Sequence, residues 1–142
     1  MIPDLAEVQV DIRALPGQDM DDVRAMIAEA VGDLADHVEV VEVTEDPSSE
    51  SPIDTPLWAA LGRVAAGLVP GSAPVPMLLS GATDARFFRR MGVTAYGFGL
   101  YSGRIPYSEF LSMFHGDDER VDQESLRLST NLWERLALDL LG

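Results

Sequence analysis

Cysteine is absent from the 142-residue sequence. Its absence excludes disulfide bonds, thiol nucleophiles and cysteine-ligated zinc together, and it fits a reducing compartment, so we expect a cytoplasmic protein. Basic residues are scarce as well, because ten Lys and Arg stand against 24 Asp and Glu, for a formal net charge of −14. An acidic surface repels a nucleic-acid backbone and an anionic bilayer, so we expect no nucleic acid and no membrane as partner.

Long apolar runs and histidines are also scarce. No segment approaches the roughly 20 apolar residues that a membrane-spanning helix needs. Neither of the two histidines, His37 and His115, is accompanied by a serine between flanking glycines, so a Ser-His-Asp triad is not supported. Hydrophobic residues nevertheless make up 46% of the chain, which is enough for a packed core. Chemistry on a small molecule is therefore the favoured class of function.

The beginning of the chain carries a β-α-β pattern. Apolar and polar side chains alternate over residues 8–12, which predicts a half-buried strand. After a Pro-Gly turn, Asp19 or Asp21 can cap a helix. The apolar positions of this helix are Val23, Met26, Ile27, Ala30, Val31 and Leu34. The β-branched residues of the segment 38–43 predict a second strand.

A change of composition separates this unit from the rest. Residues 45–56 hold three prolines among serines and acids, without apolar periodicity, and we interpret them as a linker. We therefore predict two domains, residues 1–45 and residues 46–142. Thr55 followed by Pro56 is a favoured start for the next helix. The buried face of that helix is predicted to contain Leu57, Leu61, Val64, Ala65 and Leu68.

Strands and helices then alternate. Residues 75–79 and 94–98 predict buried strands on either side of a short helix at residues 84–91. This helix is expected to bury Phe87 and Phe88. Because strands that are separated by helices pair in parallel, the predicted fold class is α/β.

The last part of the chain is expected to be a loop followed by a helix. Residues 99–114 predict a long irregular stretch, and such loops in compact domains are usually functional. Residues 122–141 predict a helix. Its buried face is expected to contain Leu126, Trp133, Leu136, Ala137 and Leu140.

Residues 80–86, with the sequence SGATDAR, lie between a predicted strand and a predicted helix. A helix N-terminus offers free N–H groups to an anion, and the planar guanidinium of Arg86 matches a carboxylate. The alternative is a turn that Asp84 caps while Arg86 is solvated. The glycine and lysine spacing of dinucleotide-binding and P-loop motifs is absent.

His115 lies beside several acidic residues, at the junction between the loop and the last helix. A histidine in such a place can bind zinc, and the acids can orient its second ring nitrogen. The alternative is a surface histidine in an acidic turn.

Four blocks, in this order, resemble the zinc peptidase family that includes aminoacylase, acetylornithine deacetylase, succinyl-diaminopimelate desuccinylase and glutamate carboxypeptidase. Residues 2–17 resemble the strand-and-turn entry to the second half of the family's lid, or dimerisation, domain. Residues 79–87 resemble its glycine-threonine-aspartate substrate loop, and residues 92–99 resemble the strand that follows. Residues 114–121 resemble its C-terminal metal-ligand block and are most similar to the carboxypeptidase S-like branch.

The resemblance implies a function for particular residues. The family hydrolyses N-acyl amino acids or dipeptide-like amides with a water that two zinc ions activate, although cobalt or manganese can replace zinc at such ligands. His115 then corresponds to the last metal ligand. Arg86, Gly81 and Thr83 correspond to the part that holds the free carboxylate of the substrate. Asp84 and Glu119 correspond to groups that support these loops, and Arg13 corresponds to the arginine of the lid strand.

The sequence departs from the family in two respects. Ala82 replaces the second glycine of the substrate loop, and its methyl group crowds a backbone that approaches the substrate. The family's other metal ligands and its glutamate base have no counterpart, so we expect a truncated enzyme that lacks its N-terminal half and is inactive alone. We also expect homo-oligomers, detectable by sedimentation, because an incomplete sheet leaves apolar surface open. The alternative function is a non-catalytic module that binds a carboxylate or a partner chain.

Overall fold

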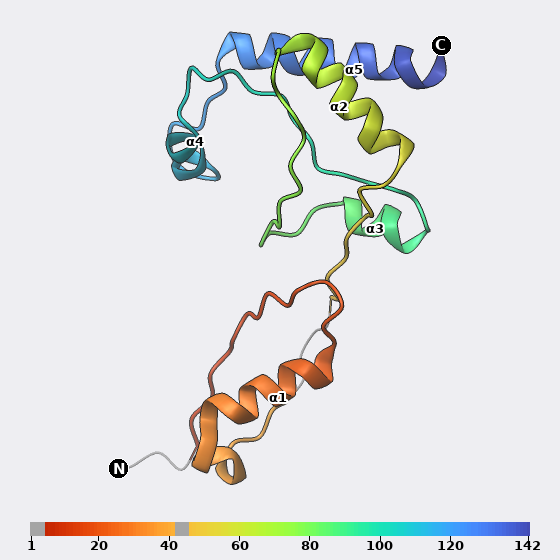
Figure 1. The fold of residues 1–142 in the computed structure, drawn as a ribbon. Helices are drawn as coiled ribbons and strands as arrows, with labels where there is room; N and C mark the ends of the chain where they lie inside the picture. Colours follow the sequence, from red (N-terminus) through yellow and green to blue (C-terminus); the bar gives the residue numbers. More distant parts are fainter. Residues whose placement is uncertain (1–4, 42–45) are drawn as a thin grey trace. The chain divides into compact units, whose positions relative to one another are not determined.

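The computed structural model describes residues 5–41 and 46–142 of the chain. The regular elements in these ranges are all helical (Figure 1). In chain order they are α1 (Met20–Val31), the 3-10 helix η1 (Gly32–His37), α2 (Pro56–Leu68), α3 (Ala85–Arg90), α4 (Tyr107–Met113) and α5 (Gln123–Leu141). No helix within the described ranges is long and apolar enough to cross a bilayer.

The described residues form two compact units. Unit 1 contains the chain up to Glu50 together with Ser80–Val93, and unit 2 contains Ser51–Leu79 and Thr94–Gly142. The segment that carries α3 therefore packs with the N-terminal part of the chain rather than with α2 and α5. The predicted boundary at residue 45 and the predicted homo-oligomer stay predictions.

Helix α1 of unit 1 begins where its capping residue predicts. The Asp19 carboxylate accepts hydrogen bonds from the backbone N–H groups of Asp21 (2.9 Å) and Asp22 (3.1 Å). The Asp22 carboxylate in turn accepts one from the Asp19 N–H at 3.1 Å, which completes a capping box. The predicted apolar face is largely uncovered, because Val23 is the one buried residue of α1 while Met26 is 42% exposed.

The predicted strands are absent from the described residues. Segments 8–12, 38–41, 75–79 and 94–98 form no β-ladder, and Val8 is 84% exposed. A strand requires a neighbour that pairs with its N–H and C=O groups, and no described segment pairs with these four in a backbone ladder. Parallel pairing and the α/β class are therefore not confirmed. Residues 42 and 43 of the second predicted strand, the start of the linker at Glu45, and residues 2–4 of the first family block lie outside the described ranges.

Unit 2 is organised around α2 and α5, which cross each other in Figure 1. The predicted start of α2 is confirmed, because the Thr55 hydroxyl accepts a hydrogen bond from the Trp58 N–H at 3.1 Å and Pro56 is the first helical residue. The buried core contains Ala60, Leu61, Val64, Ala65, Leu132 and Leu136. The half-buried Leu57, Leu68, Tyr96, Phe98 and Leu100 pack against it.

The buried face of α5 differs from the predicted one. The stripe that packs inward is Ser125, Leu128, Leu132 and Leu136. Of the predicted face, Leu136 is buried, but Leu126 is 59% and Trp133 48% exposed. Both stripes have helical spacing and apolar side chains, so periodicity alone does not choose between them. The contact with α2 selects the leucine stripe that continues into the buried Ser125.

Two further predictions were wrong for the region between α2 and α5. The stretch 99–114 contains helix α4, whose Met113 is buried. Helix α3 forms close to its predicted position but does not bury its aromatic residues, because Phe87 and Phe88 are 47% and 49% exposed. A six-residue helix is too short to present a continuous apolar stripe to a core.

Replacement of Leu132 by Ala should destabilise unit 2, because Leu132 is fully buried between α2 and α5. The expected loss in the free energy of unfolding is about 3 kcal/mol, measured by denaturant titration of tryptophan fluorescence. Both tryptophans of the chain, Trp58 and Trp133, lie in unit 2 and report on it.

The matched control is Leu126→Ala on the same helix. Leu126 is 59% exposed, so its truncation should change the free energy of unfolding by less than about 0.5 kcal/mol. A larger loss for Leu126→Ala than for Leu132→Ala would mean that α5 buries the other face.

Candidate functional site

The loop before α3 presents the predicted substrate-binding residues. Gly81, Thr83 and Asp84 are exposed. The turn into the helix is closed by backbone bonds from the Arg86 N–H to the Thr83 carbonyl (3.3 Å) and from the Phe87 N–H to the Asp84 carbonyl (3.0 Å). The Asp84 carboxylate makes no capping hydrogen bond, because Asp84 already has helical dihedral angles (φ −65°, ψ −15°). The alternative in which Asp84 caps the turn is therefore wrong.

Arg86 is held by a carboxylate from a distant part of unit 1. One Asp46 oxygen, Oδ2, accepts from Nη1 of Arg86, and the other, Oδ1, accepts from Nη2 of Arg90. The Arg86 guanidinium also lies over the Phe87 ring, 4.8 Å from its centroid. Arg86 is thus ion-paired, which excludes the alternative of a side chain held by solvent alone.

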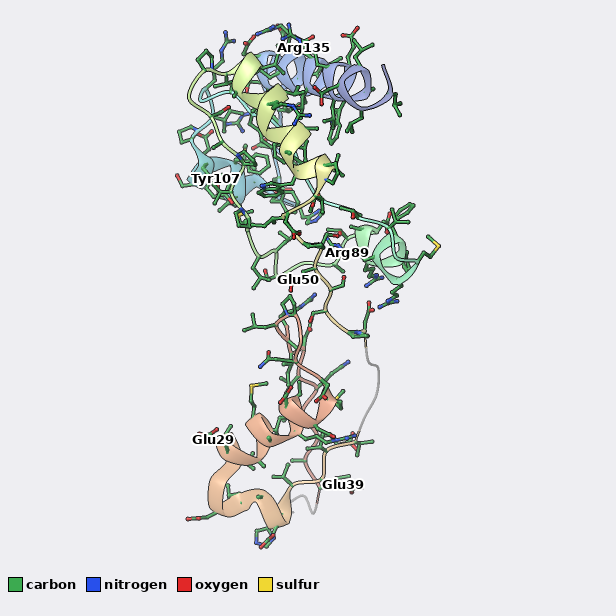
Figure 2. All side chains as sticks on the ribbon, turned by 45° about the vertical axis from the view of Figure 1, so that its right-hand side comes forward. Glu29, Glu39, Glu50, Arg89, Tyr107 and Arg135 are labelled. Carbon is green, nitrogen blue, oxygen red and sulfur yellow. The ribbon has the colours of Figure 1, made fainter. Side chains whose placement is uncertain are left out.

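Neighbouring contacts fix the segment that carries Asp46. Arg89, labelled in Figure 2, donates from Nη1 to the Ser49 carbonyl at 2.9 Å and to its hydroxyl at 3.3 Å. The Ser48 hydroxyl donates to the Leu15 carbonyl at 2.7 Å. Residues 46–49 are therefore attached both to α3 and to the turn before α1.

Arg13, the predicted arginine of the lid strand, makes only a local contact among the described residues. Its Nη2 lies 2.6 Å from Oδ2 of Asp11, and both side chains are more than half exposed. An ion pair of this kind contributes little to stability. Arg13 shares unit 1 with the substrate loop, but no described contact joins Arg13 to that loop.

His115 follows α4 in unit 2, at a point of unusual backbone geometry. Its φ is +59°, in the left-handed region that L-residues seldom adopt. The Gly116 N–H donates to the Met113 carbonyl at 2.8 Å, and the His115 ring stands edge-on to Phe114 at 4.5 Å. The imidazole is exposed, so it is accessible to a ligand.

An ion pair holds the rest of this block against α4. Nη2 of Arg120 lies 2.5 Å from Oε1 of Glu109, and its Nη1 donates to the Asp118 carbonyl at 3.2 Å. Asp118 also has a positive φ of 61°. The predicted supporting residue Glu119 is exposed beside them.

The metal-binding capacity of these residues is incomplete. Among the residues that the structure describes, no three His, Asp or Glu side chains gather closely enough to hold a metal ion. His115 offers one nitrogen donor, whereas a structural or catalytic zinc takes three or four protein ligands. The described residues therefore do not fit a two-zinc centre by themselves.

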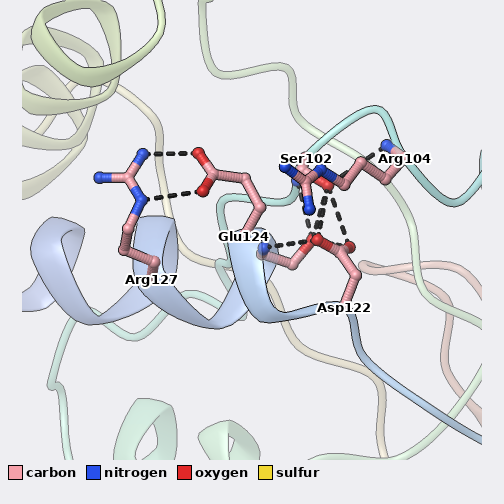
Figure 3. Close-up of polar contacts among 6 residues, drawn as sticks. Ser102, Arg104, Asp122, Glu124 and Arg127 are labelled. Carbon is pink, nitrogen blue, oxygen red and sulfur yellow. Dashed lines mark hydrogen bonds and ion pairs between the residues drawn. The ribbon is translucent and has the colours of Figure 1, made fainter.

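A polar network that sequence reasoning missed anchors the chain directly after the His115 block (Figure 3). Asp122 caps α5, and its carboxylate accepts from the Ser125 N–H (2.9 Å), the Ser125 hydroxyl (2.6 Å) and the Ser102 hydroxyl (2.9 Å). The Ser102 N–H donates to the Ser125 hydroxyl at 2.9 Å. The spacing of Asp122 and Ser125 is a capping signal, but nothing local indicates Ser102.

These hydrogen bonds favour the charged form of the carboxylate. The Ser125 hydroxyl is the largest cause, and together the bonds lower the pKa of Asp122 from 3.8 to about 2. One turn along α5, the hydrogen bond between Glu124 and Arg127 lowers the pKa of Glu124 and raises that of Arg127. The first turn of α5 is thus hydrogen-bonded to Ser102 and carries an ion pair of its own.

Comparison with known proteins decides the family. A family model described as Peptidase family M20/M25/M40 matches residues 3–139. The chain belongs to this family. The searches of curated proteins and of solved structures found no significant match. Family membership supports a metallopeptidase or amidohydrolase kind of function, and it confirms the zinc-peptidase resemblance at the level of the family.

The predicted site residues of this M20-family chain fall into two groups. Arg13, Gly81, Thr83, Asp84 and Arg86 belong to unit 1, whereas His115 and Glu119 belong to unit 2. Within unit 1 the structure joins Arg86 with Asp46 and Arg90, which the sequence did not single out. They share no local motif, because Asp46 lies 40 residues from Arg86.

The stability of unit 2 should depend on pH through Asp122. Its pKa is depressed by folding, to about 2 from 3.8, so the stabilisation is complete above about pH 4 and is lost as the pH falls towards 2. Denaturant titrations at several pH values should show this loss in the wild type and a much smaller one in Asp122→Asn.

Asp117→Asn is the matched control for charge, because Asp117 is exposed in the loop before α5. It should leave the acid dependence unchanged. Equal acid sensitivity in the wild type and in Asp122→Asn would show that the cap does not titrate as described.

Proposed function

We propose that this chain supplies the substrate-carboxylate site and one metal ligand of a metal-dependent amidohydrolase. The substrate is an N-acyl amino acid or a dipeptide-like amide with a free carboxylate. The observation that carries the proposal is Arg86, which lies in the family-like substrate loop and already binds a carboxylate, that of Asp46. The planar guanidinium suits this task because its N–H groups match the two oxygens of a carboxylate.

The other residues support this site. Gly81 and Thr83 are exposed beside Arg86, where a substrate can reach them. Asp84 and Glu119 are assigned as supporting groups of their loops, and Arg13 provides a further cation in unit 1. His115 is the metal ligand, for zinc or alternatively for cobalt or manganese. In the complete enzyme of the carboxypeptidase S-like branch, the bound metals activate water, and an α/β sheet includes segments 75–79 and 94–98.

A non-catalytic function is the second candidate. It is favoured by the observation that no three metal-binding side chains gather among the described residues. Arg86 needs no metal in order to bind a carboxylate, so the chain could hold a small acid or the acidic segment of a partner protein without hydrolysis.

These 142 residues alone should not hydrolyse N-acyl amino acids, with or without added zinc. The sequence holds two histidines and no cysteine, and His115 alone cannot hold two ions. The measurement is the release of amino acid from N-acetyl substrates, with and without a chelator. Turnover by the purified chain that is lost on chelation would contradict the ligand assignment.

The chain should nevertheless bind the carboxylate of an N-acyl amino acid through Arg86. N-Acetylglycine should bind more tightly than N-acetylglycinamide, and Arg86→Ala should weaken binding of the acid roughly tenfold, because a charge-assisted hydrogen bond is lost. Binding of the amide should change little. The measurement is a titration of the chain followed by NMR chemical shifts.

Arg63→Ala is the matched control, since Arg63 makes a similar ion pair, to Asp139 at 2.6 Å, in unit 2. This variant changes the net charge equally and should bind like the wild type. If Arg86→Ala weakens the acid and the amide to the same extent, Arg86 is structural and the carboxylate site lies elsewhere.

A further inference from the structure

We propose that Arg90 joins Arg86 in binding the carboxylate of the substrate, and that Asp46 is an internal occupant which this carboxylate displaces. The inference rests on the proposed function, because it names a second residue of the same site and the group that competes for it. It also implies a form of the chain in which the Asp46 carboxylate occupies the site and blocks the substrate.

The two arginines are placed to share one carboxylate. They are four residues apart on α3, so their side chains leave the same face of the helix. Asp46 connects them, with Oδ2 on Arg86 and Oδ1 on Arg90. A carboxylate that bridges two guanidinium groups in this way is a direct stand-in for the carboxylate of an acidic ligand.

An aromatic ring keeps the two cations together. The guanidinium carbons of Arg86 and Arg90 lie 4.8 Å and 5.9 Å from the centroid of the Phe87 ring. Both are within the range of cation–π attraction. Because the Phe87 ring attracts both guanidinium groups, Arg86 and Arg90 stay positioned to bind an anion even when Asp46 moves away.

The contact with Asp46 leaves part of Arg86 unused. The Nε atom of Arg86 is buried and has no hydrogen-bond partner within the described part of the chain, although Nη1 of the same group is paired. A carboxylate satisfies a guanidinium best when it takes two parallel N–H bonds. A free ligand is not limited by the backbone around Asp46, so it can turn to accept from Nε–H together with the parallel N–H of Nη2, whereas Asp46 accepts from Nη1.

Asp46 is also weakly enough held to leave. The Arg86 and Asp46 side chains are 32% and 39% exposed, and ion pairs with such access to water are readily exchanged. Arg89 and Ser48 anchor the neighbouring backbone through their contacts with Ser49 and Leu15. The tether keeps the Asp46 carboxylate close by, so it competes with every incoming acid and lowers the apparent affinity.

The test is a titration of the 142-residue chain with N-acetylglycine, followed by NMR. Asp46→Asn should bind the ligand about fivefold more tightly than the wild type, because the competing carboxylate is gone. Asp46→Glu keeps a carboxylate and should bind like the wild type. The double variant with Asp46→Asn and Arg90→Gln should bind N-acetylglycine about fivefold more weakly than Asp46→Asn alone. Asp139→Asn, which breaks the ion pair with Arg63 in unit 2, controls for charge.

The outcomes separate this inference from the proposed function. If Asp46→Asn binds no more tightly than the wild type while Arg86→Ala still abolishes the preference for acid over amide, the inference is overturned and the proposed function stands. If Arg86→Ala leaves the preference for acid over amide unchanged, both in the wild type and in Asp46→Asn, the proposed function fails. The wild type gives a check without any variant at Asp46, because saturating N-acetylglycine should shift the side-chain signals of both arginines. A shift of the Arg86 signals alone would overturn the role of Arg90.

Discussion

The packing of α2 against α5 buries Leu61 and Leu132, which are 1% and 0% exposed and are the largest fully buried side chains among the described residues. Other features of unit 2 depend on this contact. Tyr96, Phe98 and Leu100 pack against the same core, so the chain that leads towards the His115 block is held by it. The Asp122 cap then fixes the start of α5 to Ser102. Hydrophobic burial sets the position of the helices, and hydrogen bonds at their ends set where the connecting loops begin.

Charge organises unit 1 in a different way. The chain is strongly acidic, with a net charge of −14, and such a chain repels small carboxylates from most of its surface. Three of its ten basic residues are nevertheless concentrated in α3, at Arg86, Arg89 and Arg90. Against the acidic background this short helix is a local site of attraction for anions. Asp46 and Ser49 use that attraction to hold residues 46–49 in place.

The sequence predicted those features that depend on neighbouring residues. Asp19, Thr55 and Asp122 each begin a helix, because a cap needs only the residues of the next turn. The predicted strands are absent from the described residues, since alternation marks a segment as suited to a sheet but does not supply the neighbouring strand. The buried stripe of α5 likewise depended on α2. For the candidate site, the substrate loop with Arg86 was evident from its motif, whereas the contact between Asp46 and Arg86 joins residues 40 positions apart and leaves no local pattern.

The left-handed backbone at His115 has a consequence for how this position can change. A φ of +59° is readily adopted by glycine and disfavoured for a residue with a Cβ atom. The position therefore carries an imidazole in a conformation that glycine would accept with less strain, and Gly116 immediately follows it. Drift towards the most stable turn would replace the histidine. A histidine that is retained at this dihedral angle in related chains would accordingly indicate selection for its ring nitrogens. A glycine in its place would indicate a related chain in which this position no longer binds a metal.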